Sequence, residues 1–108
     1  MEDNFELRFN LASAYISSGN LEAAAAELAK AMVTVERVLK EEDIPEEQAP
    51  MKLQMAFINH KLQKGEEAMN VYTDVLRNHK NSQELSAVAA NNLAALRGDK
   101  DLPDSLRR

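Results

Sequence analysis

The fold is decided by the stretch LASAYISSGNLEAAAAEL, residues 11–28. In its first half, apolar residues recur at spacings of three and four, which predicts an amphipathic helix over about residues 5–17. Gly19 favours the left-handed turn that ends helices, and the side chain of Asn20 can cap a following helix. Alanine, glutamate and leucine, all strong helix formers, then follow the turn. The stretch therefore predicts two antiparallel helices joined by a tight turn.

The same pattern returns in MAFINHKLQKGEEAMNVY, residues 55–72. In each stretch a small residue stands 12 positions before a second one, and large residues follow both. The two stretches start 44 positions apart, which is 34 plus an insertion of 10, and Ala90 follows Ala56 by 34 positions. A helical hairpin that returns with a period of 34 residues resembles the tetratricopeptide repeat.

Small residues at these places allow two helices to approach closely, and large residues one turn away fill the remaining space. Each hairpin would bury one face internally and another against its neighbour, so such hairpins are stable only in a stack. We therefore expect an all-α fold of tetratricopeptide-like helical hairpins stacked in a right-handed solenoid fragment. The residues predicted to pack the repeats are Ala12, Tyr15, Ala24, Leu28, Ala56, Ala68, Tyr72 and Ala90.

The match to the repeat pattern has defects. The position where tryptophan is usual holds Arg8, Lys52 or Ser86, and Asn59 stands where the second copy would have tyrosine. The proline expected at the end of the second helix is missing from both full copies. A generic five-helix bundle is therefore kept as the alternative fold.

The chain divides into five segments on this basis. Pro45 and Pro50 bound a short acidic loop. The acidic stretch EEDIPEE, residues 41–47, is either a solvated loop or a contact for a basic partner. Gly98 is expected to end the last helix. The apolar face of that helix (Leu85, Ala89, Leu93, Leu96) is expected to be exposed unless the tail or another chain covers it. The segments are a first hairpin over 5–42, an acidic loop insertion over 43–50, a second hairpin over 51–80, a lone helix over 82–97 and a tail over 98–108.

Composition and charge exclude several classes of function. The chain has 108 residues and no cysteine, so it has no disulfide framework and no thiolate metal site. The net charge is −5, which argues against binding of nucleic acid through phosphates. Because residues 50–108 carry a small excess of bases, direct RNA binding by that half stays open as an alternative. No apolar run is long enough to cross a bilayer, so we expect no membrane insertion.

No arrangement of residues predicts catalysis. His60 and His79 have no second ligand at helical spacing, because Lys64 and Gln83 occupy the positions four residues on. The three glycines are isolated, so no glycine-rich phosphate loop exists. We therefore expect the protein not to be an enzyme and to need no metal and no cofactor.

The order of segments points to one family. It runs from ELRFNLASAYISSGNLEAA through a long second helix with an acidic insertion to QMAFINHKLQKGEEAMNVYTDVL, and then to LSAVAANNLAAL. This order resembles the tetratricopeptide region of the 72-kilodalton protein subunit of the signal recognition particle. The resemblance covers about residues 5–105.

The resemblance implies a role as a protein-binding scaffold. It implies pairing with the 68-kilodalton subunit of the particle in co-translational protein targeting to the endoplasmic reticulum. It also implies a cytoplasmic location on a ribonucleoprotein associated with ribosomes and that membrane, with RNA reached only indirectly through a region absent here. An unrelated tetratricopeptide adaptor or co-chaperone module is the alternative.

The first helix of each hairpin in such arrays lines a concave groove. Most of the groove positions are apolar in this chain, which suits a partner helix or an extended apolar peptide. Plain core packing is the alternative for the leucine and phenylalanines, and local bonding to water is the alternative for Asn91. Exposed ends of the array would also favour self-association. The predicted groove residues are Phe9, Ser13, Ile16, Leu53, Phe57, His60, Lys61 and Asn91.

Overall fold

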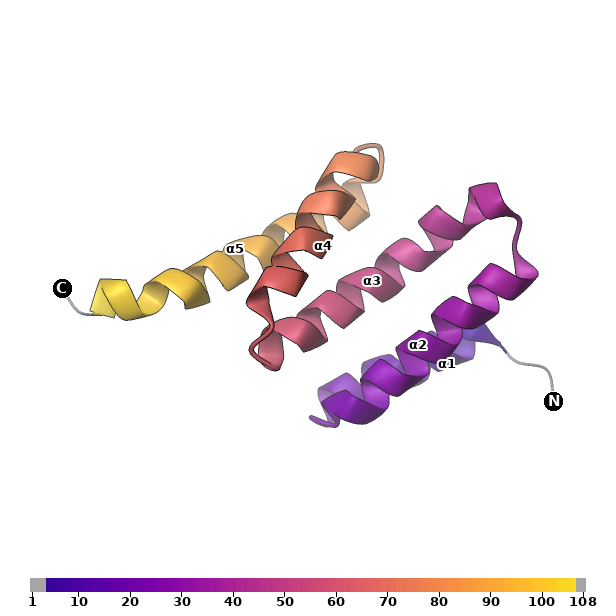
Figure 1. Ribbon diagram of the computed structural model, residues 1–108, viewed down its shortest axis with the longest axis horizontal. Helices are drawn as coiled ribbons and strands as arrows, with labels where there is room; N and C mark the ends of the chain where they lie inside the picture. The colour runs from indigo at the N-terminus through magenta and orange to yellow at the C-terminus, as the bar shows by residue number, and fades with distance from the viewer. Residues whose placement is uncertain (1–3, 107–108) are drawn as a thin grey trace.

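The computed structural model describes residues 4–106, and the side chains of residues 4–98. This part of the chain is helical and contains no strand, which confirms the all-α prediction. The chain reverses direction at each connection, so that α1, α3 and α5 run one way and α2 and α4 run the other (Figure 1). The elements are α1 Phe5–Ser17, α2 Leu21–Val38, the 3-10 helix η1 Glu41–Asp43, α3 Ile44–Lys61, α4 Gly65–Asn78 and α5 Gln83–Leu106.

Asparagine side chains cap both helices of the first hairpin, and the cap at Asn20 is the one that the sequence predicts. The Oδ1 atom of Asn4 accepts from the backbone N–H groups of Glu6 and Leu7, at 2.9 and 3.1 Å. Gly19 takes a left-handed φ of +84°, and Asn20 caps α2 by accepting from the backbone N–H of Ala23 at 3.3 Å. Side chains at both helix starts therefore satisfy N–H groups that would otherwise lack partners.

The predicted acidic loop over 43–50 is wrong, because α3 already begins at Ile44. Pro45 stands in the first turn of α3, where its missing N–H has no helical partner to lose. The buried side chain of Gln48 then fixes this turn against α2, since its Nε2 donates to the carbonyl of Met32 at 3.0 Å and to Glu36 Oε2 at 3.1 Å. In turn, α2 ends at Val38 instead of near residue 42.

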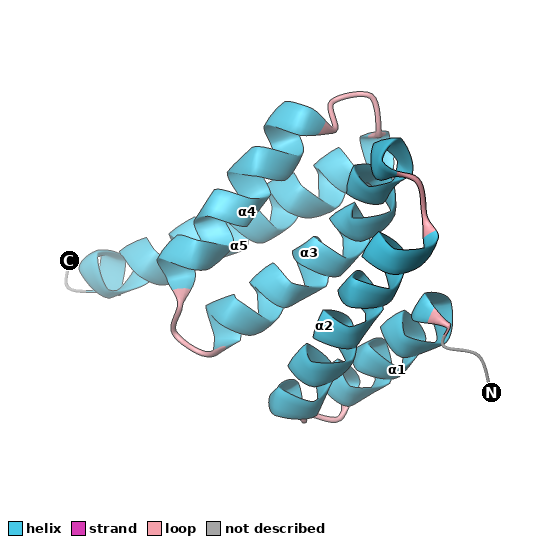
Figure 2. Cartoon of the chain, turned by 45° about the vertical axis from the view of Figure 1, so that its right-hand side comes forward, coloured by secondary structure: helices cyan, strands magenta, loops and turns pink. Residues whose placement is uncertain are grey.

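The connection between α3 and α4 also contains a left-handed residue. The left-handed residue of this turn is Gln63, with φ of +68°, and not Gly65. Gly65 instead begins α4, where a Cβ atom would lie 3.3 Å from Leu96 Cδ1 of α5. The glycine therefore serves close packing between the two helices. All of these connections are short (Figure 2).

The predicted end of α5 at Gly98 and its open apolar face are both wrong. The helix continues through Gly98 to Leu106, because one glycine in a helix costs only about 1 kcal/mol relative to alanine. Three of the four face residues, Ala89, Leu93 and Leu96, are buried against α3 and α4. The side chains of the predicted tail beyond Gly98 lie outside the described residues.

Two clusters of buried apolar side chains form the core, and α3 belongs to both. Met51 and Ile58 of α3 join the first cluster, and Leu53 and Ala56 of the same helix join the second. The first hairpin and the α4–α5 pair are therefore packed onto opposite faces of one central helix. The first cluster also contains Ala12, Ala24, Leu28, Ala31 and Val35, and the second Ala68, Tyr72, Val75, Ala89, Leu93 and Leu96.

The predicted repeat-packing residues are buried with one clear exception. Ala90, placed by its spacing of 34 from Ala56, is exposed, and its neighbour Ala89 is buried. One residue turns a helix by about 100°, so a shift of one position moves a side chain to a different face. Among the others, Ala12, Ala24, Leu28, Ala56, Ala68 and Tyr72 are fully enclosed, and Tyr15 is half-buried against the first cluster.

The two left-handed turns allow a paired test of stability. Replacing Gln63 by glycine should raise the free energy of unfolding by about 1 kcal/mol, because a side chain is strained at positive φ. Replacing Gly19 by alanine should lower it by about 1 kcal/mol through the backbone alone, since nothing lies within 4 Å of an added Cβ. Urea unfolding measures both changes, and a destabilised Gln63→Gly variant would contradict this account.

The register of α5 can be tested with two leucine substitutions. Ala89→Leu should overfill the second cluster and cost roughly 1–3 kcal/mol of unfolding free energy. Ala90→Leu should stay within about 0.5 kcal/mol of the parent chain, because that position faces solvent. Equal losses in thermal or urea unfolding would show that the register described for α5 is incorrect.

Candidate functional site

An apolar groove crosses the three helices that run in the same direction. It has a volume of about 530 Å³ and lies on the side of the molecule formed by α1, α3 and α5. This size and its largely apolar lining are typical of binding sites in proteins. We call it the apolar groove, and it is lined by Phe9, Ile16, Pro50, Leu53, Gln54, Phe57, Glu84, Leu85, Val88 and Asn92.

A smaller hollow of about 340 Å³ continues the apolar groove toward the first turns of α1 and α3. The two share Phe9 and Pro50, so together they form one trough between α1 and α3. We call this second part the side hollow, and it is lined by Phe5, Glu6, Phe9, Asn10, Glu47, Pro50 and Met51.

A hydrogen bond between hairpins fixes one wall of the apolar groove. Gln54 Nε2 of α3 donates to Ser13 Oγ of α1 at 2.6 Å, and Ser13 Oγ donates to the carbonyl of Phe9 at 3.2 Å. The side-chain oxygen of Gln54, Oε1, is buried and forms no hydrogen bond within the described chain. Gln54 therefore holds α1 and α3 in register while leaving one acceptor unsatisfied.

Beneath the apolar groove lies the fully buried side chain of Tyr72. Burial raises the pKa of its phenol, and the side chain of Asn92, which lines the groove, partly offsets that rise. No described residue forms a hydrogen bond of good geometry with the hydroxyl. The two unsatisfied polar atoms of the core, in Gln54 and Tyr72, thus belong to residues at or next to the groove.

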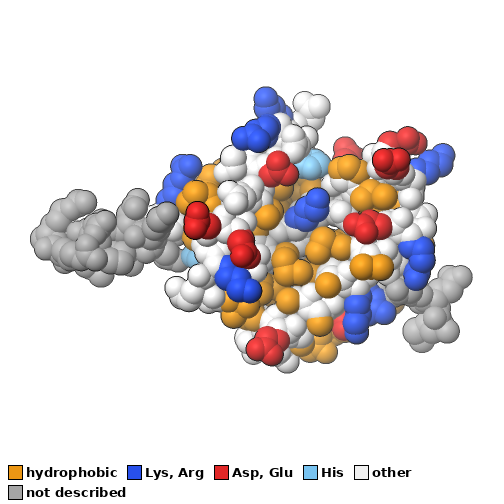
Figure 3. Space-filling model, in the orientation of Figure 1, with side chains coloured by type: hydrophobic (Ala, Val, Ile, Leu, Met, Phe, Trp, Pro, Cys, Tyr) orange, Lys and Arg blue, Asp and Glu red, His pale blue; other side chains and the backbone are white. Residues whose placement is uncertain are grey.

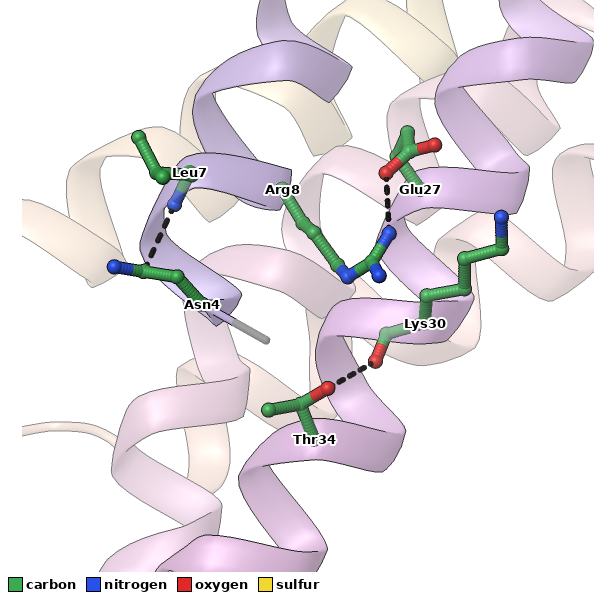
Figure 4. A network of polar contacts seen from close by, with 6 residues as sticks. All are labelled: Asn4, Leu7, Arg8, Glu27, Lys30 and Thr34. Atoms are coloured by element: carbon green, nitrogen blue, oxygen red, sulfur yellow. Dashed lines mark hydrogen bonds and ion pairs between the residues drawn. The ribbon is translucent and has the colours of Figure 1, made fainter. Parts of the chain in front are cut away.

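Polar contacts on α1 and α2 stabilise the first hairpin (Figure 4). Arg8 Nη1 forms an ion pair with Glu27 Oε1 at 2.9 Å, so the position where the repeat pattern usually has tryptophan links the two helices through charge. Farther along α2, Thr34 Oγ1 donates to the carbonyl of Lys30 at 3.0 Å. The ion pair joins α1 to α2, and the hydrogen bond of Thr34 lies within α2.

Two known proteins are similar in sequence to nearly the whole chain. Signal recognition particle subunit SRP72 of Schistosoma mansoni is 34% identical over 110 residues, covering 96% of this chain. SRP72 of Caenorhabditis elegans is 28% identical over 112 residues, covering 99% of it. The chain is related to a region of SRP72. It spans only 16% and 18% of the length of these two relatives.

The resemblance to the 72-kilodalton subunit that the sequence predicts is thereby confirmed. No family model matches the chain, and no solved structure matches it. The relation to SRP72 therefore rests on these two sequences, and the tetratricopeptide arrangement stays a prediction.

Four of the predicted groove residues line the apolar groove of this SRP72-related chain, and the other four do not. Ser13 does not line the groove but accepts a hydrogen bond from Gln54, which does. His60 lines a separate hollow at the turn between α3 and α4. Lys61 lies with its Nζ 5.3 Å from the centre of the Phe57 ring, a favourable but weak contact. The four that line the groove are Phe9, Ile16, Leu53 and Phe57.

Asn91, which was predicted to line the groove, is exposed. Its neighbour Asn92 lines the apolar groove instead. The sequence analysis also missed Pro50, which was assigned to a loop, and Val88, whose side chain is 41% exposed although it is apolar. Val88 is an apolar residue that lies outside the apolar face predicted for α5. That position was the signal that could have identified it.

Metal ligands and membrane spans were sought among the described residues. No group of three or more histidine, cysteine or acidic side chains there could hold a metal ion. None of the helices in that part of the chain is both long enough and apolar enough to span a bilayer.

The buried phenol predicts a pH-dependent loss of stability. Tyr72→Phe should raise the free energy of unfolding by about 1–3 kcal/mol at pH 7, because it removes a buried hydroxyl that lacks a hydrogen bond of good geometry. Above pH ~10 the difference in stability between the variant and the parent chain should widen. In that range the unfolded phenol ionises at its ordinary pKa of 10.0, whereas the folded phenol, with a raised pKa, keeps its proton.

Urea unfolding of both proteins at pH 7 and at pH ~11 measures this difference. Tyr15 is retained in both and serves as the internal control for general alkaline effects. An identical decline of stability with pH in the two proteins would show that Tyr72 ionises equally easily when folded.

Proposed function

We propose that this chain is a protein-interaction scaffold of the signal recognition particle, and that its apolar groove holds a segment of a partner protein. The observation that carries the proposal is the groove itself, which three helices far apart in the sequence build together. Phe9, Phe57 and Val88 present apolar surface there that is only partly buried. Apolar surface of this kind at a concave site is typical of the recognition of partner helices and peptides.

The arrangement of helices supports a tetratricopeptide-like solenoid fragment. Neighbouring helices are antiparallel, each hairpin packs closely where Ala12 and Ala24, or Ala56 and Ala68, are buried, and the central α3 is shared. In such stacks the first helices of the hairpins line one concave surface. The positions of α1, α3 and α5 around the groove are consistent with that surface.

The partner that we propose is the 68-kilodalton subunit of the particle, as the resemblance implies. The two relatives are subunits of the signal recognition particle, which makes another protein of that particle the first partner to test. The role would be co-translational targeting to the endoplasmic reticulum, in the cytoplasm and with ribosomes. This chain would act as a scaffold, and RNA would be bound by other regions.

Removing the aromatic wall of the groove should weaken partner binding. Phe9→Ala combined with Phe57→Ala should raise the Kd for the 68-kilodalton subunit about tenfold or more, because half-buried aromatic anchors carry much of the energy of such interfaces. Binding of the purified proteins can be measured by calorimetry, with circular dichroism to show that helicity is retained.

The matched control is Val33→Ala. Val33 is 60% exposed on α2 and does not line the groove, so its removal should leave the Kd unchanged. Normal binding by the double phenylalanine variant would exclude the groove as the binding site.

A further inference from the structure

The charged side chains that line the trough are all acidic. Glu84 lines the apolar groove, and Glu6 and Glu47 line the side hollow. No lysine or arginine lines either part. None of the three glutamates forms an ion pair with a described residue. The trough therefore combines an apolar surface with negative charge that no side chain of residues 4–98 neutralises through an ion pair.

The three glutamates occupy equivalent places in three parallel helices. Glu6 stands in the first turn of α1, Glu47 in the first turn of α3 and Glu84 in the first turn of α5. Because these helices run in the same direction, their first turns lie at the same end of the trough (Figure 1). At the opposite end, the last turn of α3 carries the basic residues His60 and Lys61. Neither of these two residues lines the trough, so the charge of the trough is negative and lies at the end formed by the first turns.

The helix dipole explains why a glutamate stands in each first turn, but not why they gather. A negative side chain near the N-terminus of any helix is stabilised by the partial positive charge there. Glu22 of α2 and Glu66 of α4 show the same preference. Since α2 and α4 run the other way, those residues lie outside the trough. Parallel packing alone therefore brings Glu6, Glu47 and Glu84 to one end.

The opposite side of the molecule has a different distribution of charge. Over α2, α3 and α4, hydrophobic side chains are interspersed with both acidic and basic ones (Figure 3). A partner with one sign of charge would gain little there, because attraction and repulsion largely cancel. In the trough a single sign of charge borders an apolar surface, which favours one class of ligand.

From this geometry we infer that the trough binds a peptide segment with an apolar stretch and lysines or arginines at one end. The apolar stretch lies against Phe9, Leu53 and Phe57, and the basic end lies at the first turns of α1, α3 and α5. This inference rests on the proposed function of the groove and adds the charge and the orientation of the partner segment.

Two synthetic peptides test the inference with the intact chain. They share one leucine-rich segment, and one carries lysines at an end where the other carries glutamates. Fluorescence anisotropy at low salt should show the lysine peptide binding about tenfold more tightly, because each exposed ion pair contributes modestly. The preference should shrink at physiological salt, where screening is strong. Equal affinities for the two peptides would overturn the inference.

Two pairs of substitutions separate the trough from the overall acidity of the chain. Glu47→Gln with Glu84→Gln should remove most of the preference for the lysine peptide. Glu22→Gln with Glu66→Gln changes the net charge equally, also in first turns, and should leave the preference intact. An equal loss in both double variants would mean that general attraction to an acidic protein causes the preference, which overturns the inference.

Failure of the proposed function has a different signature. If the groove holds the apolar stretch, Phe9→Ala with Phe57→Ala should weaken both peptides alike. Equal binding of the two peptides that is lost in this variant would overturn the charge preference and leave the groove supported. No binding of either peptide by the parent chain would overturn both.

Discussion

The structure depends on one helix that buries two opposite faces. In α3, Met51 and Ile58 point into the first hairpin's cluster, and Leu53 and Ala56 point into the second. At about 100° per residue these pairs lie on opposite sides of the helix. A helix of this kind cannot be stable alone, because either face would be exposed to water if one hairpin were absent. The first hairpin and the α4–α5 pair are therefore parts of one cooperative unit joined through α3.

The groove follows from the same constraint. With α2 and α4 packed beside α3 and running against it, α1 and α5 come to lie on its remaining side and parallel to it. Three parallel helices place their first turns at the same end of the groove. Side chains that stabilise the start of each helix therefore come to lie on one shared surface. A glutamate in a first turn stabilises its own helix. Three such residues at one end of a trough give that end a single sign of charge, which is the basis of the proposed preference for a basic segment.

The sequence predicts the helices and their pairing well, and the choice between adjacent residues poorly. The first turn depends on its glycine and asparagine, and the pairing of the helices depends on the spacing of alanines such as Ala24. Both are local features that a sequence records directly. Ala89 and Ala90, like Asn91 and Asn92, are chemically identical neighbours, so no propensity distinguishes them. Only the rotation of α5 on α4 decides which one is buried or lines the groove. That rotation is set by tertiary packing. A fixed spacing of 34 residues, which selected Ala90, does not contain it, whereas the apolar period of α5 already groups Ala89 with Leu93 and Leu96.

The irregularities of the chain gather at the groove. Pro50 removes the N–H that would bond to the carbonyl one turn earlier in α3, at a cost of about 3 kcal/mol in an ordinary helix interior. Gln54 keeps a buried oxygen without a partner, and Tyr72 keeps a buried hydroxyl next to Asn92. Unsatisfied polar groups cost about 1–3 kcal/mol each, and leucine or phenylalanine would avoid them. Departures of this kind concentrate where a protein must do more than fold, so their position supports the groove as the functional surface.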